Sequence, residues 1–328
     1  MGTILPIDGD DRHPNIVGGT SIPDRGAEVP AAVGWCPAAS GRTVSPMTQP
    51  TPTPDPDRPR HLPVEIAPET WVIQDTLGEG TAPQTVHMNS MVIRGAEPIV
   101  VDTGMPTNRD RFLEDLFGIV EPEDVRWVFL SHDDVDHYGN VDAVMDACPN
   151  AVLLTNWFTT ERLHGELQVP PTRWRWLDDG DQLDLGDRTV TALRPPLFDS
   201  PTTRGLFDAR TGVYWASDCY ATPVASGTAF VEELDPEAWA GGLTTFALWN
   251  SPWVNLVDQA AFAASCRRIE DLPLHAIAGT HGPTIEASNL MQAHELLRAV
   301  PTAVAPPQPD QAVLDHMLAA MGAAVPAA

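Results

Sequence analysis

The feature that most constrains this chain is a run of histidines and aspartates, Ser131–His137, between a hydrophobic segment and a segment of helical spacing. Residues 125–131 predict a buried strand, and residues 137–147 predict a helix. Four side chains in or beside the turn between them are suited to bind a metal: His132, Asp134, Asp136 and His137. Imidazole and carboxylate together are the ligand chemistry of zinc, iron and manganese. The alternative is an acidic surface turn with two incidental histidines.

Two later segments each place a metal-binding residue type at the end of a predicted strand. Residues 213–217 predict a strand that ends at Asp218, and a carboxylate in such a place is suited to bridge two metals. Residues 276–278 predict a strand that is followed by His281 inside a tight Gly-Pro turn. The order is thus a histidine-rich loop, an acid at a strand end and a histidine at a strand end. This order favours a metal site over the surface turn.

Two further motifs complete a resemblance to a known family. Val101–Gly104 reads V-D-T-G, and Gly279–Pro283 reads G-T-H-G-P. Together with the loop at 131–137 and with Asp218, these motifs resemble the metallo-β-lactamase superfamily, whose loop reads H-x-H-x-D-H. The resemblance covers about residues 70–290. It implies an α/β fold, the αββα sandwich, with a two-metal site at one edge of the sheets.

The chain departs twice from the commonest pattern of that superfamily. Asp134 stands where the loop usually has its middle histidine, and the next ligand segment, Pro196–Pro201, contains no histidine. We place Asp199 in the position of that histidine, with Phe198 as the alternative if the alignment shifts by one residue. Both departures exchange nitrogen for oxygen. Such a set resembles the di-iron, oxygen-binding module of flavodiiron proteins, whose loop reads H-x-E-x-D-H.

The resemblance implies a ligand set for two divalent metal ions. One ion would be held by His132, Asp134 and Asp199, and the other by Asp136, His137 and His281, with Asp218 as the bridge. Three nitrogens and four carboxylates form a hard, anionic donor set. Such a set favours iron or manganese, with zinc as the alternative.

The rest of the chain divides into three parts. Residues 1–67 are rich in Pro and Gly, include the run PTPTPDPDRP at 50–59, and predict a disordered extension. Residues 68–300 predict the metallo-β-lactamase-like domain, within which 238–269 is mostly helical. Residues 301–328 predict a Pro/Ala-rich tail with a short helix at 311–321.

The charge balance excludes several classes of partner. The chain has 45 acidic residues against 19 basic ones, all of them Arg, which gives a net charge of −26. A nucleic-acid partner or an anionic membrane surface would require a basic face instead. No apolar run is long enough to cross a bilayer, and no secretory signal is visible. We therefore expect a soluble, cytoplasmic protein.

Two functions fit these observations. The first is a dinuclear hydrolase in which a metal-bridging hydroxide attacks an ester, lactone, thioester or phosphoester, with Asp136 as the catalytic residue that manages the proton. The alternative is a di-iron protein that binds or reduces dioxygen or nitric oxide, with a separate electron donor. The expected partners are otherwise a small-molecule substrate and a second copy of the chain in a homodimer. A non-catalytic relic is disfavoured, because all seven ligand positions hold competent side chains.

Several other residues near these motifs stay open on sequence alone. Asp102 is either a turn acid or a carboxylate that orients a ligand histidine. Arg204 is either an exposed strand residue or a binder of an anionic substrate. For Tyr138, Cys219, Tyr220, Trp249 and Trp253 we favour a structural role over a place in the site.

Overall fold

Two β-sheets form the centre of the chain in the computed structural model, which describes residues 59–79 and 84–320. The described residues all belong to one compact unit, residues 50–328. Most of the predicted N-terminal extension, residues 1–58, lies outside the described residues, as does the end of the tail, residues 321–328. Among the described helices, none is long and apolar enough to cross a membrane.

The first sheet has seven strands and is antiparallel at one end and parallel at the other. Its order is β1 (Val64–Ala67), β2 (Thr70–Ile73), β5 (Ser90–Ile93), β6 (Ile99–Val101), β7 (Trp127–Phe129), β8 (Val152–Thr155) and β9 (Trp174–Trp176). The strands from β6 to β9 run parallel, with Val101 opposite Phe129 at the end of their pairing. The loops that follow β6 and β7 therefore leave the same edge of the sheet.

The second sheet has six strands. Its order is β10 (Gln182–Asp184), β11 (Thr189–Leu193), β12 (Gly205–Asp208), β13 (Val213–Trp215), β14 (Ala276–Ala278) and β15 (Ile285–Glu286). Only β13 and β14 are parallel, with Trp215 opposite Ala278, so the segments after these two strands also start side by side. A small ribbon, β3 (Thr76–Leu77) with β4 (Val86–His87), lies outside both sheets.

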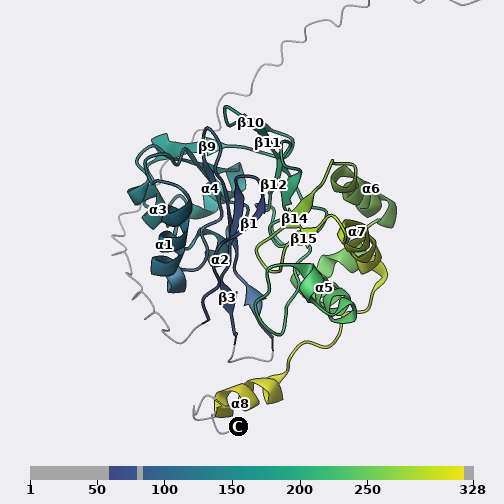
Figure 1. Cartoon of the computed structure of the whole chain (residues 1–328). Helices are drawn as coiled ribbons and strands as arrows, with labels where there is room; N and C mark the ends of the chain where they lie inside the picture. The colour runs from purple at the N-terminus through teal and green to yellow at the C-terminus, as the bar shows by residue number, and fades with distance from the viewer. Residues whose placement is uncertain (1–58, 80–83, 321–328) are drawn as a thin grey trace, which may run out of the picture. The chain divides into compact units, whose positions relative to one another are not determined.

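Helices cover the outer faces of the two sheets (Figure 1). The helices are α1 (Arg109–Ile119), α2 (Val135–Tyr138), α3 (Val141–Ala147), α4 (Trp157–Leu163), α5 (Pro236–Asn250), α6 (Gln259–Glu270), α7 (Leu290–Ala299) and α8 (Gln311–Ala320). Short segments of 3-10 helix are η1 (Pro106–Asn108), η2 (Pro171–Arg173), η3 (Val231–Glu233), η4 (Pro252–Leu256) and η5 (Val300–Thr302). Helices α1, α3 and α4 pack on the first sheet, and α5, α6 and α7 pack on the second.

The alternation of strand side chains produces these layers. In β6, Ile99 and Val101 face the second sheet, while Val100 between them faces α1 and α3. Successive side chains of a strand point to opposite faces, so a strand covered on both faces is a continuous apolar run. All three residues of β6 are fully buried. The predicted αββα sandwich is therefore confirmed.

Several boundaries differ from the prediction. The predicted helix at 137–147 is two helices, α2 and α3, because Gly139 and Asn140 separate them. The predicted helical stretch at 238–269 is broken into α5, η4 and α6, with Pro252 at the first break, where a proline ring cannot continue the helix. The C-terminal boundary of the packed part lies slightly beyond residue 300, because η5 buries Val300 and Pro301.

The N-terminal boundary at residue 68 is wrong. Strand β1 pairs with β2, and its residues Ile66 and Ala67 are buried in the core between the sheets. The prediction missed these four strand residues, because they directly follow a proline-rich segment and were assigned to it. The folded part therefore begins by residue 64.

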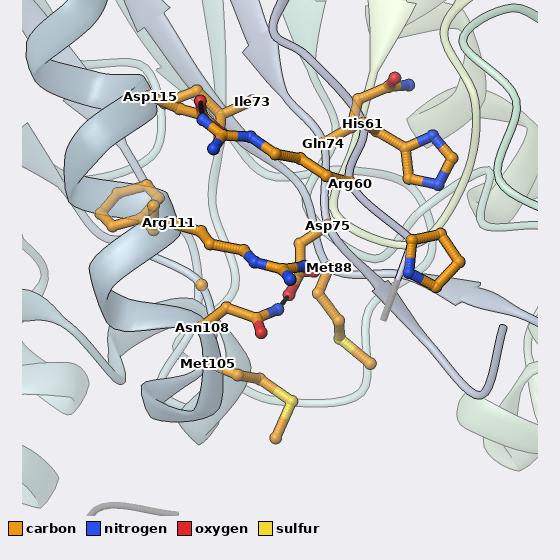
Figure 2. Close-up of a pocket in the computed structure, with 13 residues that line it drawn as sticks. Arg60, His61, Ile73, Gln74, Asp75, Met88, Met105, Asn108, Arg111 and Asp115 are labelled. Atoms are coloured by element: carbon orange, nitrogen blue, oxygen red, sulfur yellow. Dashed lines mark hydrogen bonds and ion pairs between the residues drawn. The ribbon is translucent and has the colours of Figure 1, made fainter. Parts of the chain in front are cut away.

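The segment before β1 also packs on the domain. The guanidinium of Arg60 donates to Glu114 and Asp115 of α1 at 2.9 and 2.7 Å. Figure 2 shows Arg60 beside Asp115 and Arg111 beside Asp75, around a cavity of about 20 Å³. None of the seven predicted metal ligands lines this cavity. We interpret it as part of the attachment of the N-terminal segment to α1.

A truncation separates the contribution of β1 from that of the remaining chain. A chain that begins at Pro68 lacks β1 and the ion pairs of Arg60, whereas a chain that begins at Pro59 keeps both. Loss of one buried Ile side chain costs about 2 kcal/mol, which in a domain of this size lowers the thermal midpoint by about 5 °C. Calorimetry of the two chains measures this difference, and equal midpoints would show that β1 does not stabilise the domain.

Candidate metal centre

The loop after β7 turns directly into α2 and places its histidines in the interior. The backbone N–H of His137 donates to the carbonyl of Asp134 at 2.9 Å, which closes the first turn of α2. His132 and His137 are buried, whereas the side chain of Asp134 is 63% exposed. The loop therefore holds two imidazoles inside the fold and one carboxylate toward solvent.

Asp102, which the sequence left open, orients His137. Its carboxylate accepts hydrogen bonds from the backbone N–H and the hydroxyl of Ser131 at 2.7 and 2.5 Å, and from the indole of Trp215 at 3.0 Å. It also accepts from Nδ1 of His137 at 3.0 Å. A hydrogen bond at Nδ1 leaves Nε2 as the ring nitrogen that is free to bind a metal. Carboxylates commonly orient metal-binding histidines in this way. Asp102 is therefore a positioning residue for His137.

His132 is oriented from the second half of the chain. Its Nδ1 lies 3.2 Å from the hydroxyl of Thr202 and 3.1 Å from the hydroxyl of Thr203. Its Nε2 lies 3.4 Å from an oxygen of Asp134 and 3.6 Å from an oxygen of Asp199. The sequence did not predict the role of either threonine, because both lie just beyond the ligand segment at 196–201 and belong to no motif.

Asp199, rather than Phe198, is the residue that faces His132. The ring of Phe198 packs instead on Trp253, with 5.1 Å between the ring centres. The carbonyl of Phe198 accepts a hydrogen bond from the indole of Trp253 at 2.9 Å. These contacts fix the turn with Asp199 on the inner side, so the geometry agrees with the preferred of the two alignments.

His281 is held by the turn that follows β14. Its Nδ1 bonds to the backbone carbonyl of His87 at 2.9 Å, and its Nε2 lies 3.3 Å from Asp136 and 3.4 Å from Asp218. The side-chain amide of Asn89 donates to the carbonyls of Gly279 and Gly282 at 3.1 and 2.8 Å. A Cβ atom on Gly279 would lie 2.7 Å from the carbonyl oxygen of Ser217, so only glycine permits this close approach.

Asp218 lies between the two groups of candidate ligands. Its Oδ1 is 3.0 Å from Nε2 of His137 and 3.4 Å from Nε2 of His281. Potential ligand atoms lie within 4.8 Å of one another in three sets: Asp136 with His137 and His281, His132 with Asp199 and Asp218, and His132 with Asp133 and Asp134. All seven residues that the sequence proposed as ligands are thus brought together.

Unpaired polar atoms show that this cluster suits a cation. Buried atoms without a hydrogen-bond partner include Nε2 of His132, Nε2 of His137, Oδ1 of Asp199 and Oδ1 of Asp218. Buried polar atoms are normally paired, and leaving them unpaired is costly. Because these atoms converge and each carries a lone pair, they fit one or two metal ions. The fold therefore contains a candidate dinuclear metal site made of His and Asp side chains.

The charges of the cluster are strongly coupled. Burial alone would lower the pKa of His137, but the carboxylates of Asp102 and Asp218 outweigh it and raise that pKa well above the usual 6.5. The pKa of His281 rises similarly, because Asp218 outweighs the effect of burial. The two histidines in turn outweigh burial at Asp218 and hold its pKa well below the usual value. Burial and the charge of Asp218 raise the pKa of Asp199.

The neighbouring acid Asp133 faces away from the centre. Its carboxylate accepts hydrogen bonds from Thr202 and Arg162, both at 2.6 Å. It approaches His132 on the Nδ1 side, at 3.6 Å, and not on the Nε2 side that faces Asp134 and Asp199. Asp133 is thus a structural link between the loop and α4.

The other open residues mostly point elsewhere. Arg204 pairs with Asp178 at 2.5 Å, so the structure gives no support for its binding an anionic substrate. The hydroxyl of Tyr138 donates to Glu166, and Tyr220 bonds to His294. Cys219 is buried, and Trp249 donates to the carbonyl of Pro306. Trp253 donates to the carbonyl of Phe198, one residue before Asp199, and Tyr220 lines the cavity against Asp218.

Comparison with known proteins agrees with this geometry. The sequence profile of the metallo-beta-lactamase superfamily matches residues 84–282, more than half of the chain. The chain belongs to this superfamily. The matched region contains all seven candidate ligands.

Two curated relatives each match 65% of this chain. An uncharacterised protein of Methanocaldococcus jannaschii is 25% identical over 214 residues, which cover 65% of this chain and 52% of that protein. An anaerobic nitric oxide reductase flavorubredoxin of Pectobacterium atrosepticum is 22% identical over 217 residues, 65% of this chain and 42% of its own length. The chain thus spans about half, or less, of these curated relatives.

The structural comparison supports the same fold. Rubredoxin oxygen:oxidoreductase of Desulfovibrio gigas superposes with a TM-score of 0.60 at 15% sequence identity, over 72% of this chain and 60% of that one. At this identity the likeness concerns the fold alone. The resemblance to flavodiiron proteins, first seen in the loop motif, is therefore found again in the fold, and the family that the comparisons show is the metallo-beta-lactamase superfamily.

Substitution of Asp218 tests the shared position of this carboxylate. Because its Oδ1 lies within 3.4 Å of both His137 and His281, and its side chain also groups with His132, Asp218→Ala should lower the metal content from two ions toward one or none. Asp133→Ala should keep two ions, since its carboxylate faces Arg162 and Thr202. Elemental analysis of both variants measures this, and equal losses would show that the assignment of the loop is wrong.

Metal affinity should depend strongly on pH. A metal binds the neutral imidazole, and the raised pKa values of His137 and His281 mean that protons must leave as the ion enters. Affinity should therefore rise with pH through and above about 6.5, by about tenfold per pH unit for each proton released. Calorimetric metal titrations at several pH values measure this, and a flat profile would contradict the histidine assignment.

Proposed function

We propose that this chain carries a di-iron centre that binds and reduces a diatomic gas, dioxygen or nitric oxide, with electrons from a separate donor. The observation that carries the proposal is the composition of the cluster around Asp218. One group of candidate ligands contains a single imidazole and the other contains two, with carboxylates in the remaining positions. Oxygen-rich donor sets of this kind favour iron or manganese over zinc.

The space beside the centre supports a small ligand. A cavity of about 10 Å³ lies against Asp218 and is lined by residues such as Phe198, Phe246 and Asn250. This is about enough room for one water-sized molecule. A diatomic gas fits such a space, whereas an ester or a phosphoester would require it to widen.

The names of the related proteins support the same chemistry. One relative is called an anaerobic nitric oxide reductase, and one structural neighbour a rubredoxin oxygen:oxidoreductase. Reduction of either gas consumes electrons and protons. Since this chain spans only part of such proteins, we propose that the electrons come from another protein or domain.

The residues of this chain would perform holding and orienting roles. His132, Asp134 and Asp199 would hold one iron, Asp136, His137 and His281 the other, and Asp218 would bridge them. When bound, iron would supply the reversible one-electron chemistry that the side chains lack. Asp102, Thr202 and Thr203 would fix the far nitrogens of His137 and His132, so that both imidazoles keep Nε2 toward the ions.

Hydrolysis is the second candidate function. One observation favours it: the carboxylate of Asp134 is 63% exposed, so one side of the cluster is open to solvent and to larger substrates. In this case Asp136, 18% exposed, would manage the proton of the attacking water. Such a hydrolase would work with zinc as well as with iron and would need no electron donor.

Metal exchange separates the two candidates. Protein loaded with iron and reduced without air should change its absorption and paramagnetic spectra when nitric oxide or dioxygen is added, and zinc-loaded protein should not. Asp199→Ala should lose most of this response, because it removes a carboxylate 3.6 Å from His132. Hydrolysis of ester, lactone or thioester substrates with either metal, without a spectral response to the gases, would favour the hydrolase instead.

A further inference from the structure

One face of the segment formed by α5 and η4 contacts the candidate metal centre at three points. Phe246 and Asn250 are four residues apart and share one side of α5, and Trp253 follows in η4, after the helix has ended. The ring of Phe246 lies 5.5 Å from the ring of His281. Trp253 donates to the carbonyl of Phe198, one residue before Asp199. The segment formed by α5 and η4 thus contacts His281 through Phe246 and the turn of Asp199 through Trp253.

Asn250, the last residue of α5, makes the central contact. Its side-chain N–H group donates to Oδ2 of Asp218 at 3.5 Å. The other oxygen of that carboxylate, Oδ1, has no hydrogen-bond partner and lies near His137 and His281. The amide of Asn250 therefore bonds to Oδ2 of Asp218, and Oδ1 stays available to a metal ion between the candidate ligands.

The position of Asn250 follows from the end of the helix. Helix α5 stops at Asn250, because Pro252 begins η4 and cannot extend the α-helical ladder. Ser251 is fully buried beside it, and both residues line the cavity against Asp218. Asn250 itself is half-buried, with the buried residues Ala247, Leu248 and Ser251 around it in the chain.

We propose that Asn250 is a positioning residue for the bridging carboxylate Asp218, within an outer wall formed by Phe246, Asn250 and Trp253. The inference rests on the proposed metal centre but not on the gas chemistry. By holding Oδ2, the amide sets the direction in which Oδ1 approaches His137 and His281. Partners of this kind behind a ligand typically change metal affinity by about ten- to a hundredfold.

Manganese(II) alone is the probe for the test, with the full chain in each case. Asn250→Leu removes the hydrogen-bond donor. Asn250→Asp replaces it with a carboxylate, whose negative charge repels that of Asp218. Both variants should bind manganese about ten- to a hundredfold more weakly. Both should also change the paramagnetic resonance signal that arises from coupling of two neighbouring ions, which a loss of stability alone would not do.

A matched control lies five residues farther along the chain. Asn255 donates to the carbonyls of Pro301 and Ala303, away from the centre, so Asn255→Leu should keep the affinity and the coupled signal. Manganese affinity within about twofold of the wild type in both Asn250 variants would overturn the proposal. Because no gas is involved, a protein that binds manganese as expected but ignores dioxygen and nitric oxide would contradict only the proposed function.

Discussion

A single buried carboxylate connects the two sheets at the edge where the candidate metal centre lies. Asp102 follows β6 of the first sheet and accepts hydrogen bonds from Ser131 after β7, from His137 in α2 and from Trp215 in β13 of the second sheet. A buried charge is tolerated only where partners surround it, and here five donors, the hydroxyl of Thr280 among them, converge on two oxygens. The relative position of the two sheets and the orientation of His137 thus depend on the same group.

The backbone at this edge adopts unusual conformations. Asp102 and Ser217, one at the end of each sheet, have φ values of 57° and 54°, in the left-handed region that disfavours residues with a Cβ atom. The hydroxyl of Ser131, whose proton goes to Asp102, lies 2.9 Å from the hydroxyl of Ser217, so the two strained turns are joined through one residue. Strain of this kind persists only where the surrounding structure holds it, and it is common at functional sites.

The sequence was sufficient for the sandwich, which its apolar runs predict, and for the grouping of the seven candidate ligands, which the family resemblance implies. Buried strands are continuous apolar runs, and ligand residues follow strand ends that parallel pairing brings to one edge. The partners behind the ligands were not predictable, since Thr202, Thr203 and Asn250 meet their histidine or carboxylate only after the two halves pack. The start of β1 was also missed, because Ile66 and Ala67 follow a proline-rich stretch and their burial depends on pairing with β2.

The candidate ligands are divided between the two halves of the sandwich. His132 and Asp134 come from the loop after β7 and Asp136 and His137 from α2, whereas Asp199, Asp218 and His281 come from loops of the second sheet. Ions bound between them would cross-link the two halves of the sandwich, because each half supplies only part of the coordination sphere. The free energy of ion binding would then also be free energy that keeps the sheets together. Removal of the metal ions would thus lower the cooperativity of unfolding between the two halves of the molecule, in addition to abolishing the chemistry of the site.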